Sequence, residues 1–191
     1  MKLGFILQNF VIFKNKRFFV NADFKRVIKA TALLKEENIS ERARVKTALK
    51  LLLTSNSFRR SKLLSHSDKS SLLNAVFELL GTGAKSKSGG KKTLCLEKDG
   101  AFIYGAFLQA FGLDLQKDKL DWRVFRALLS CIPESTALFN VMKIRAAEIP
   151  KDASQEEAER LCALKKRYSL DEDFENNYAG ELEVLFNKLC E

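Results

Sequence analysis

The apolar positions near the start of the chain follow a strand pattern and then change to helical spacing. Residues 10–20, FVIFKNKRFFV, contain two runs rich in Val, Ile and Phe around Lys14-Asn15-Lys16, which is typical of a β-hairpin. Apolar residues then recur at intervals of three and four from Phe24 to about Lys35. Because a lone hairpin is only marginally stable, we expect this helix to cover it.

Helical spacing continues over the next fifty residues. A helix is predicted from Ser40 to about Thr54, with an apolar side and a basic side. Residues 58–71 are basic and rich in serine, and a further apolar helical face ends at Gly81. The pattern therefore predicts an N-terminal part, residues 1–80, made of a β-hairpin and basic helices.

A change of composition then marks a linker and a second part. Residues 81–92, GTGAKSKSGGKK, consist almost entirely of Gly, Ser, Thr and Lys, which predicts a flexible linker. Residues 93–191 are predicted to be helical. The expected helices are 99–111 closed by Gly112, 119–131 capped by Asp118 and stopped by Pro133, about 135–147, about 154–168 opened by a capping box, and a last amphipathic helix around 178–189. The predicted fold is mainly α with a small N-terminal β-hairpin (α+β), a helical bundle.

Aromatic residues are concentrated in residues 101–131. Their spacing of three and four predicts that the helices 99–111 and 119–131 bury them by facing each other across the turn 113–117. In the first of these helices, Tyr104 and Leu108 widen the apolar side, so we expect it to be buried over much of its girth. An exposed aromatic platform is the alternative interpretation.

Length and composition are those of a folded protein. The chain has 191 residues, of which 46% are apolar and 30% charged. No apolar run approaches the roughly 20 residues needed to cross a bilayer, so no membrane partner is expected. Residues 1–7 loosely resemble a secretory signal but lack a small-residue cleavage site, so we interpret them as the start of the fold. The four cysteines are spread along the chain without paired spacing, which predicts reduced thiols.

The net charge of +9 is unevenly distributed. Residues 1–69 contain 16 Lys and Arg against 5 Asp and Glu, a net charge of +11, whereas residues 70–191 have a net charge of −2. This asymmetry indicates either a nucleic acid or an acidic partner. No nucleic-acid-binding motif accompanies the basic residues, which favours a solvated face or a surface for an acidic protein. The candidate partner-binding residues are Arg42, Arg44, Lys46, Lys50, Arg59 and Arg60.

The residues that could support catalysis do not form a recognisable site. His66, the sole histidine, lies near Asp68 and several serines but has no nucleophile motif around it. The glycines of residues 81–92 have the wrong spacing for a phosphate-binding loop. The acidic residues 171–175 do not match a calcium loop. We therefore expect no enzyme activity, no catalytic residue, no cofactor and no metal.

A spaced pattern in residues 98–150, KDGAFIYGAFLQAFGLDLQKDKLDWRVFRALLSCIPESTALFNVMKIRAAEIP, resembles the bacteriophage gp-fifteen family of tailed phages and prophages of Gram-positive bacteria. Four features carry the resemblance. They are an acidic-start helix with an Ile-Tyr-x-Ala-Phe core, a Gly-Leu-Asp-Leu turn, a tryptophan helix with Phe-Arg-Ala-Leu, and a helix with Ile144-Arg145 where the family has Ile-x-x-Arg. VNADFKRVIK and LKKRYSLDED are also similar to the family's first helix entry and its tail. The signature residues are Tyr104, Phe107, Asp114, Trp122, Phe125, Arg126 and Arg145.

The resemblance implies a role in tail assembly. Members of this family are similar in size and gene position to the second tail assembly chaperone of long-tailed phages. The implied function is that of a non-enzymatic chaperone that binds the tape-measure protein, alongside a companion tail chaperone, in the cytoplasm of the bacterial host and outside the mature virion. The sequence is also compatible with a homo-oligomer. The alternatives are a nucleic-acid-binding phage protein that uses the basic N-terminal helices and a prophage-encoded inhibitor of a host protein.

Overall fold

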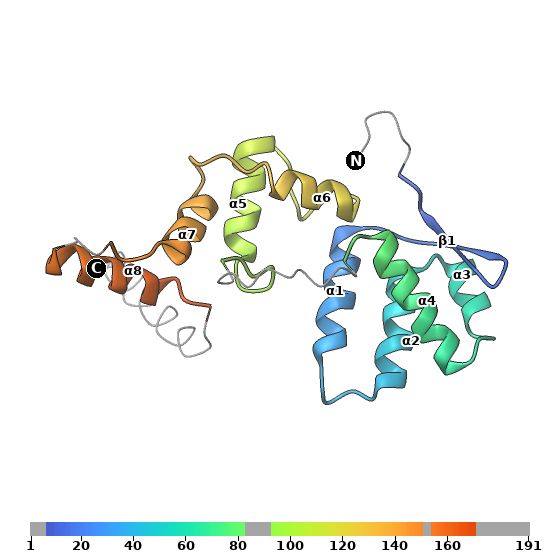
Figure 1. The fold of residues 1–191 in the computed structure, drawn as a ribbon. Helices are drawn as coiled ribbons and strands as arrows, with labels where there is room; N and C mark the ends of the chain where they lie inside the picture. Colours follow the sequence, from blue (N-terminus) through green and yellow to red (C-terminus); the bar gives the residue numbers. More distant parts are fainter. Residues whose placement is uncertain (1–6, 83–92, 151–153, 171–191) are drawn as a thin grey trace, which may run out of the picture. The chain divides into compact units, whose positions relative to one another are not determined.

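The computed structural model describes residues 7–82, 93–150 and 154–170. These residues are mainly helical with a small antiparallel hairpin near the N-terminus (Figure 1), so the predicted fold class is confirmed. The elements in chain order are β1 Phe10–Phe13, β2 Lys16–Phe19, α1 Phe24–Lys35, α2 Glu41–Leu52, α3 Ser55–Ser61, α4 His66–Leu79, α5 Gly100–Phe111, α6 Trp122–Leu129, α7 Ala137–Ala146 and α8 Gln155–Arg167.

The chain forms two compact units, and their composition differs from the expected division at residues 81–92. The first unit holds β1, β2, α1 to α4 and α6, and the second holds α5, α7 and α8. Helix α6 was expected in the C-terminal part, whereas the structure places residues 116–131 with the N-terminal elements. Most of the predicted linker, residues 83–92, and the predicted last helix lie outside the described residues.

The hairpin turns over two residues, Lys14 and Asn15. Both have positive φ angles, 48° and 58°, which is the requirement of a type I′ turn and matches the twist of the strands. The register pairs Val11 with Phe18 and Phe10 with Phe19. Val11 and Phe18 are buried, while Phe19 is 47% exposed. The predicted hairpin is therefore present, with one face in the core and one in solvent.

The hairpin packs mainly on α3 and α4, and not on α1 as expected. The buried hydroxyl of Ser57 in α3 accepts a hydrogen bond from the Phe19 amide at 2.8 Å. At the turn, the Lys14 ammonium lies 2.7 Å from a carboxylate oxygen of Asp68 in α4. Helix α3 begins at Ser55, and the polar residues 55–57 form its first turn.

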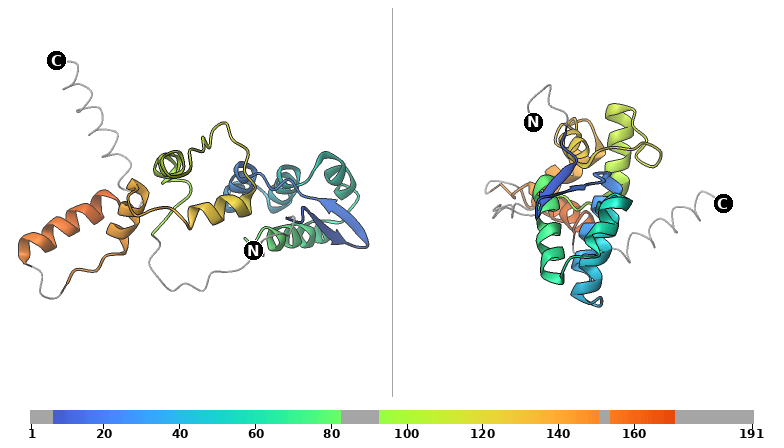
Figure 2. Two further views of the ribbon diagram at one scale, coloured as in Figure 1. Left: turned by 90° about the horizontal axis from the view of Figure 1, so that it is seen from above. Right: turned by 90° about the vertical axis from the view of Figure 1, so that its right-hand side faces the viewer.

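Helices α1, α2 and α4 lie side by side, with α2 in contact with both others (Figures 1 and 2). Their apolar stripes meet in a core that also receives one side chain from the hairpin and one from α6. The fully buried large apolar side chains of this unit are Phe18, Val27, Leu49, Leu52, Leu72, Val76, Leu80 and Phe125. Since these residues come from five elements, β2, α1, α2, α4 with its C-cap Leu80, and α6, the core ties the first unit together.

Helices α1 and α6 begin next to each other. An isolated antiparallel bridge joins Asp23 to Asp121, and each of these two aspartates caps its helix. The Asp121 carboxylate accepts a hydrogen bond from the Arg123 amide at 2.9 Å. Helix α6 therefore starts at Trp122, and Asp121 has the capping role that the sequence assigned to Asp118.

Aromatic stacking holds α6 in the first unit. The rings of Phe24 and Phe125 are stacked, with centroids 4.7 Å apart and planes 12° apart. Trp122 stacks on Phe125 at 5.7 Å and is only 6% exposed. Aromatic pairs of this kind add about 0.5–1.5 kcal/mol to the stabilisation from burial. The chain thus returns to its N-terminal helices at residues 116–131.

The second unit is organised around a buried ion pair. The Arg145 guanidinium in α7 binds the Asp99 carboxylate through two hydrogen bonds of 2.7 and 2.8 Å. Asp99 is 1% exposed, and it also accepts a hydrogen bond from the Cys95 amide at 2.8 Å. Arg145 further donates to the carbonyls of Thr93 and Tyr168. One side chain therefore joins the segments before α5 and after α8.

Helix α5 buries one face, which corrects the expectation that it is buried over much of its girth. Ile103, Ala106 and Phe107 are buried, whereas Leu108 is 46% exposed. Gly112 adopts the left-handed conformation, with φ 65°, and ends the helix as predicted. The predicted pairing of aromatics between α5 and α6 is also corrected. Phe125 stacks in the first unit, while Phe107 packs edge-on against Phe111 in the second.

The buried ion pair leads to a first prediction. Replacing Arg145 with Met leaves the Asp99 carboxylate buried without its charge partner, which costs about 3–5 kcal/mol. We expect the amides of α5 and α7 to exchange faster in R145M, as measured by hydrogen exchange of the full chain with mass spectrometry. The control K143M changes an exposed lysine of the same helix. Equal exchange of α5 in R145M and K143M would contradict this role.

The cap of α6 leads to a second prediction. Burial raises the pKa of Asp121, but hydrogen bonds from Arg123 and its positive charge outweigh this effect, so the pKa lies below the ordinary 3.8. A lowered pKa stabilises the fold above pH 3.8, and this contribution is lost as the pH falls through the lowered value. D121N keeps the cap but loses the charge.

We expect D121N to reduce the free energy of unfolding by about 1 kcal/mol at pH 6, because the ion pair is partly exposed. The difference between the two proteins should shrink as the pH falls below 4. Urea unfolding followed by the fluorescence of Trp122 measures it. A difference that stays constant from pH 6 to pH 2.5 would contradict the prediction.

Candidate partner-binding surfaces

Three of the six predicted partner-binding residues form a row on α2. Arg42, Lys46 and Lys50 are exposed and follow one another at intervals of four, so they share one face of the helix. The adjoining face of α2 is buried through Val45, Leu49 and other apolar residues. The structure therefore confirms that this helix presents positive charge to solvent.

Arg44 differs from its neighbours. It is half-buried, and its guanidinium donates a hydrogen bond of 3.0 Å to the Leu34 carbonyl in the last turn of α1. Carbonyls at the end of a helix lack partners inside the helix, and a cation there also interacts favourably with the helix dipole. Arg44 thus holds α1 and α2 together.

The other two predicted residues lie in the last turn of α3. Arg59 is exposed. The Arg60 guanidinium lies 5.6 Å from the centroid of the buried Phe18 ring, a cation–π contact between α3 and the hairpin. Of the six predicted residues, Arg44 and Arg60 therefore have contacts that support the fold.

A lysine-lined hollow lies where α2, the end of α3 and α4 meet. We call it the lysine pocket. Its volume is about 300 Å³, and its lining consists of Lys46, Leu49, Phe58, Ser61, Lys62 and Lys69. Only Lys46 was among the predicted residues. Lys69 comes from α4, and sequence spacing could not show that it meets lysines from two other helices.

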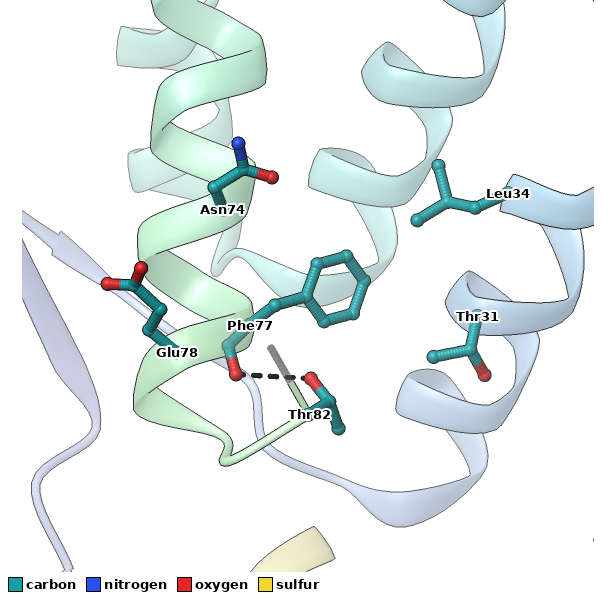
Figure 3. A pocket seen from close by; sticks show the side chains of 6 residues that line it. All are labelled: Thr31, Leu34, Asn74, Phe77, Glu78 and Thr82. Carbon is teal, nitrogen blue, oxygen red and sulfur yellow. Dashed lines mark hydrogen bonds between the residues drawn. The ribbon is translucent and has the colours of Figure 1, made fainter. Parts of the chain in front are cut away.

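A second hollow, the α1/α4 groove, has mixed character. Its volume is about 370 Å³, and it is lined by Thr31, Leu34, Asn74, Phe77, Glu78 and Thr82 (Figure 3). The Phe77 ring projects from α4 toward Thr31 and Leu34 on α1. The Thr82 hydroxyl donates a hydrogen bond of 3.1 Å to the Phe77 carbonyl. Phe77 belongs to the apolar helical face that the sequence predicted to end at Gly81, but its ring is half-exposed.

The outer face of the hairpin is a third surface. Ile12 is 64% exposed, and Phe19 is 47% exposed beside Phe10 on the neighbouring strand. The Arg17 guanidinium lies 5.2 Å from the centroid of the Phe10 ring. An apolar sheet face rimmed by a cation is thus open to solvent in the first unit.

Comparison with known proteins gives the family. A family model described as Bacteriophage Gp15 protein matches residues 7–170, which is 164 of the 191 residues. The chain belongs to the Bacteriophage Gp15 protein family. The match confirms the resemblance seen in the sequence and includes α2, α3 and α4, which carry the lysine pocket. No curated protein and no solved structure matches the chain.

The Gp15 signature residues have mostly structural positions. Phe107, Trp122 and Phe125 are buried, and Arg145 binds Asp99. Arg126 is exposed, and it donates a hydrogen bond of 2.6 Å to the Gly81 carbonyl after α4. The remaining two, Tyr104 in α5 and Asp114 after it, are half-buried. Sequence reasoning missed Asp99 as the partner of Arg145, although its acidic position before α5 was visible.

Several residues that the sequence analysis considered for chemistry can be placed in this Gp15 protein. His66 begins α4, and its Nε2 atom lies 3.9 Å from a carboxylate oxygen of Glu41. Among the described residues, no group of His, Cys, Asp and Glu could hold a metal ion. Cys95, Cys131 and Cys162 are free thiols. The acidic residues 171–175 lie outside the described residues.

None of the helices in residues 7–82, 93–150 and 154–170 is long and apolar enough to cross a membrane.

The different surroundings of Arg42 and Arg44 lead to a third prediction. R44Q removes the hydrogen bond to the Leu34 carbonyl and should lower the free energy of unfolding by about 1 kcal/mol. R42Q removes the same charge from an exposed position and should change it by less than about 0.5 kcal/mol. Urea unfolding followed by Trp122 fluorescence compares the two variants. Equal destabilisation would show that Arg44 does not join α1 to α2.

Proposed function

We propose that this Gp15 protein is a non-enzymatic tail assembly chaperone that binds the tape-measure protein during tail morphogenesis. The observation that carries the proposal is the family match over residues 7–170, which shows a phage protein. The resemblance of the family in size and gene position to the second tail chaperone of long-tailed phages supports the finer role. The work would take place in the host cytoplasm, together with a companion chaperone and before the virion is complete.

The α1/α4 groove has features that suit a helical partner. A tape-measure helix offers apolar side chains at intervals of three and four residues, and grooves between helices bind such stripes. In the α1/α4 groove, Phe77 and Leu34 supply apolar surface, while Asn74 on α4 supplies a polar group (Figure 3). We infer that one turn of a partner helix enters between α1 and α4.

Nucleic-acid binding is the second candidate, and the row on α2 favours it. Arg42, Lys46 and Lys50 are exposed on one face, as phosphate contacts require. Arg44, however, is half-buried and donates to the Leu34 carbonyl, and the exposed Arg60 has a cation–π contact with Phe18. This supports a protein partner over a nucleic acid.

The proposal leads to a fourth prediction. Co-expression with the adjacent tape-measure protein should keep that protein in the soluble fraction, measured by gel analysis after centrifugation. The groove variant L34E/N74E places two carboxylates where apolar side chains would enter, so we expect it to lose most of this effect. The control N56E/N140E adds the same charge at exposed positions outside the groove.

Two outcomes separate the parts of this proposal. A tape-measure protein that is equally insoluble with and without the wild-type chain would contradict the chaperone function. Solubilisation that survives in L34E/N74E would contradict the groove as its site and leave the function standing. Unfolding of each variant, followed by Trp122 fluorescence, checks that the first unit is intact.

A further inference from the structure

The lysine pocket combines positive charge with an apolar base. Lys46 comes from α2, Lys62 follows α3, and Lys69 belongs to the first turns of α4. Leu49, at the base, is fully buried, and Phe58 is half-buried. Three helices therefore bring three ammonium groups to one hollow of about 300 Å³ that is the size of a few side chains.

The charge of the pocket is not balanced within the first unit. The Lys69 ammonium donates a hydrogen bond of 3.3 Å to the Lys62 carbonyl, and the Lys62 ammonium lies 5.6 Å from the centroid of the Phe58 ring. No ion pair within the described residues joins a carboxylate to any of the three lysines. Like charges around one hollow repel one another, so an anion that enters it gains from all three.

The apolar residues of the pocket favour an acidic protein segment over a nucleic acid as its occupant. A nucleic acid uses flat aromatic faces to stack its bases, but the Lys62 ammonium covers one face of Phe58. The hydroxyl of Ser61, which could bind a phosphate, is buried and donates to the Phe58 carbonyl at 2.7 Å. What is left is the accessible part of Phe58 beside three lysines, which suits an apolar side chain flanked by carboxylates.

We propose that the lysine pocket binds an acidic amphipathic segment of a partner protein. An apolar side chain of that segment contacts Phe58 above Leu49, and neighbouring Asp or Glu side chains pair with Lys46, Lys62 and Lys69. This site lies on α2, α3 and α4, whereas the α1/α4 groove uses α1 and α4, so the inference does not depend on the proposed function.

The test measures binding of defined probes to the full chain. The main probe is a fluorescein-labelled peptide of about 18 residues, or five helical turns, with Leu and Glu placed to form an acidic amphipathic helix. An all-Glu peptide and a single-stranded oligonucleotide of similar length are the comparison probes. Fluorescence anisotropy at low ionic strength gives the dissociation constants.

The expected result depends on the position of the charges as well as their number. K46Q/K62Q/K69Q should weaken binding of the amphipathic peptide at least about tenfold. The control R42Q/K50Q/R59Q removes the same charge from exposed positions of α2 and α3 and should weaken it less than about threefold. K46R/K62R/K69R should bind like the wild type, and the all-Glu peptide should bind more weakly because it lacks the apolar side chain.

Three results would overturn the inference. The first is that the amphipathic peptide does not bind the wild type. The second is that the two glutamine variants weaken its binding equally, which would show an effect of net charge alone. The third is an oligonucleotide whose binding depends on the three lysines as strongly as that of the peptide, which would make the pocket a nucleic-acid site. Trp122 fluorescence during urea unfolding confirms that every variant retains the first unit.

Discussion

The stacking of Phe125 on Phe24 decides how the chain is divided. Helix α6 lies almost a hundred residues after α1, yet the two helices begin at a shared backbone bridge between Asp23 and Asp121. The burial of Phe125 and Trp122 that accompanies this contact places α6 in the core formed by α1, α2 and α4. Without this stacking, α6 would no longer cover the core of α1, α2 and α4. Residues 116–131 would then lose the packing that places them with the N-terminal helices.

The second unit depends on a different kind of interaction. Few of its described apolar side chains are buried, and Arg145 joins its segments by binding Asp99 and two backbone carbonyls. Taking two charges out of water is costly, and the full set of hydrogen bonds around both groups offsets this cost. The first unit is thus held mainly by aromatic and aliphatic packing. The second is organised around the buried ion pair of Arg145 and Asp99, and loss of either partner is destabilising.

Three candidate partner surfaces lie on the elements of the first unit. The α1/α4 groove, the outer hairpin face and the lysine pocket offer apolar surface, and the last two have cations beside it. Both proposals of a protein partner rest on this combination of apolar surface and charge. Basic residues on α2 and α3 serve two purposes, since Arg44 and Arg60 stabilise the fold while Arg42, Lys46 and Lys50 face solvent.

The sequence by itself determined the features that arise from neighbouring residues. The hairpin around Lys14 and Asn15, the end of α5 at Gly112 and the capping box of α8 follow from local backbone preferences and short-range hydrogen bonds. Only the tertiary structure decided the partner of Arg145, the packing of α6 on α1, and the meeting of lysines from three helices. These arise from contacts between residues far apart in the chain, such as the 46 positions that separate Asp99 from Arg145, and periodicity along one helix does not show which other helix covers its face.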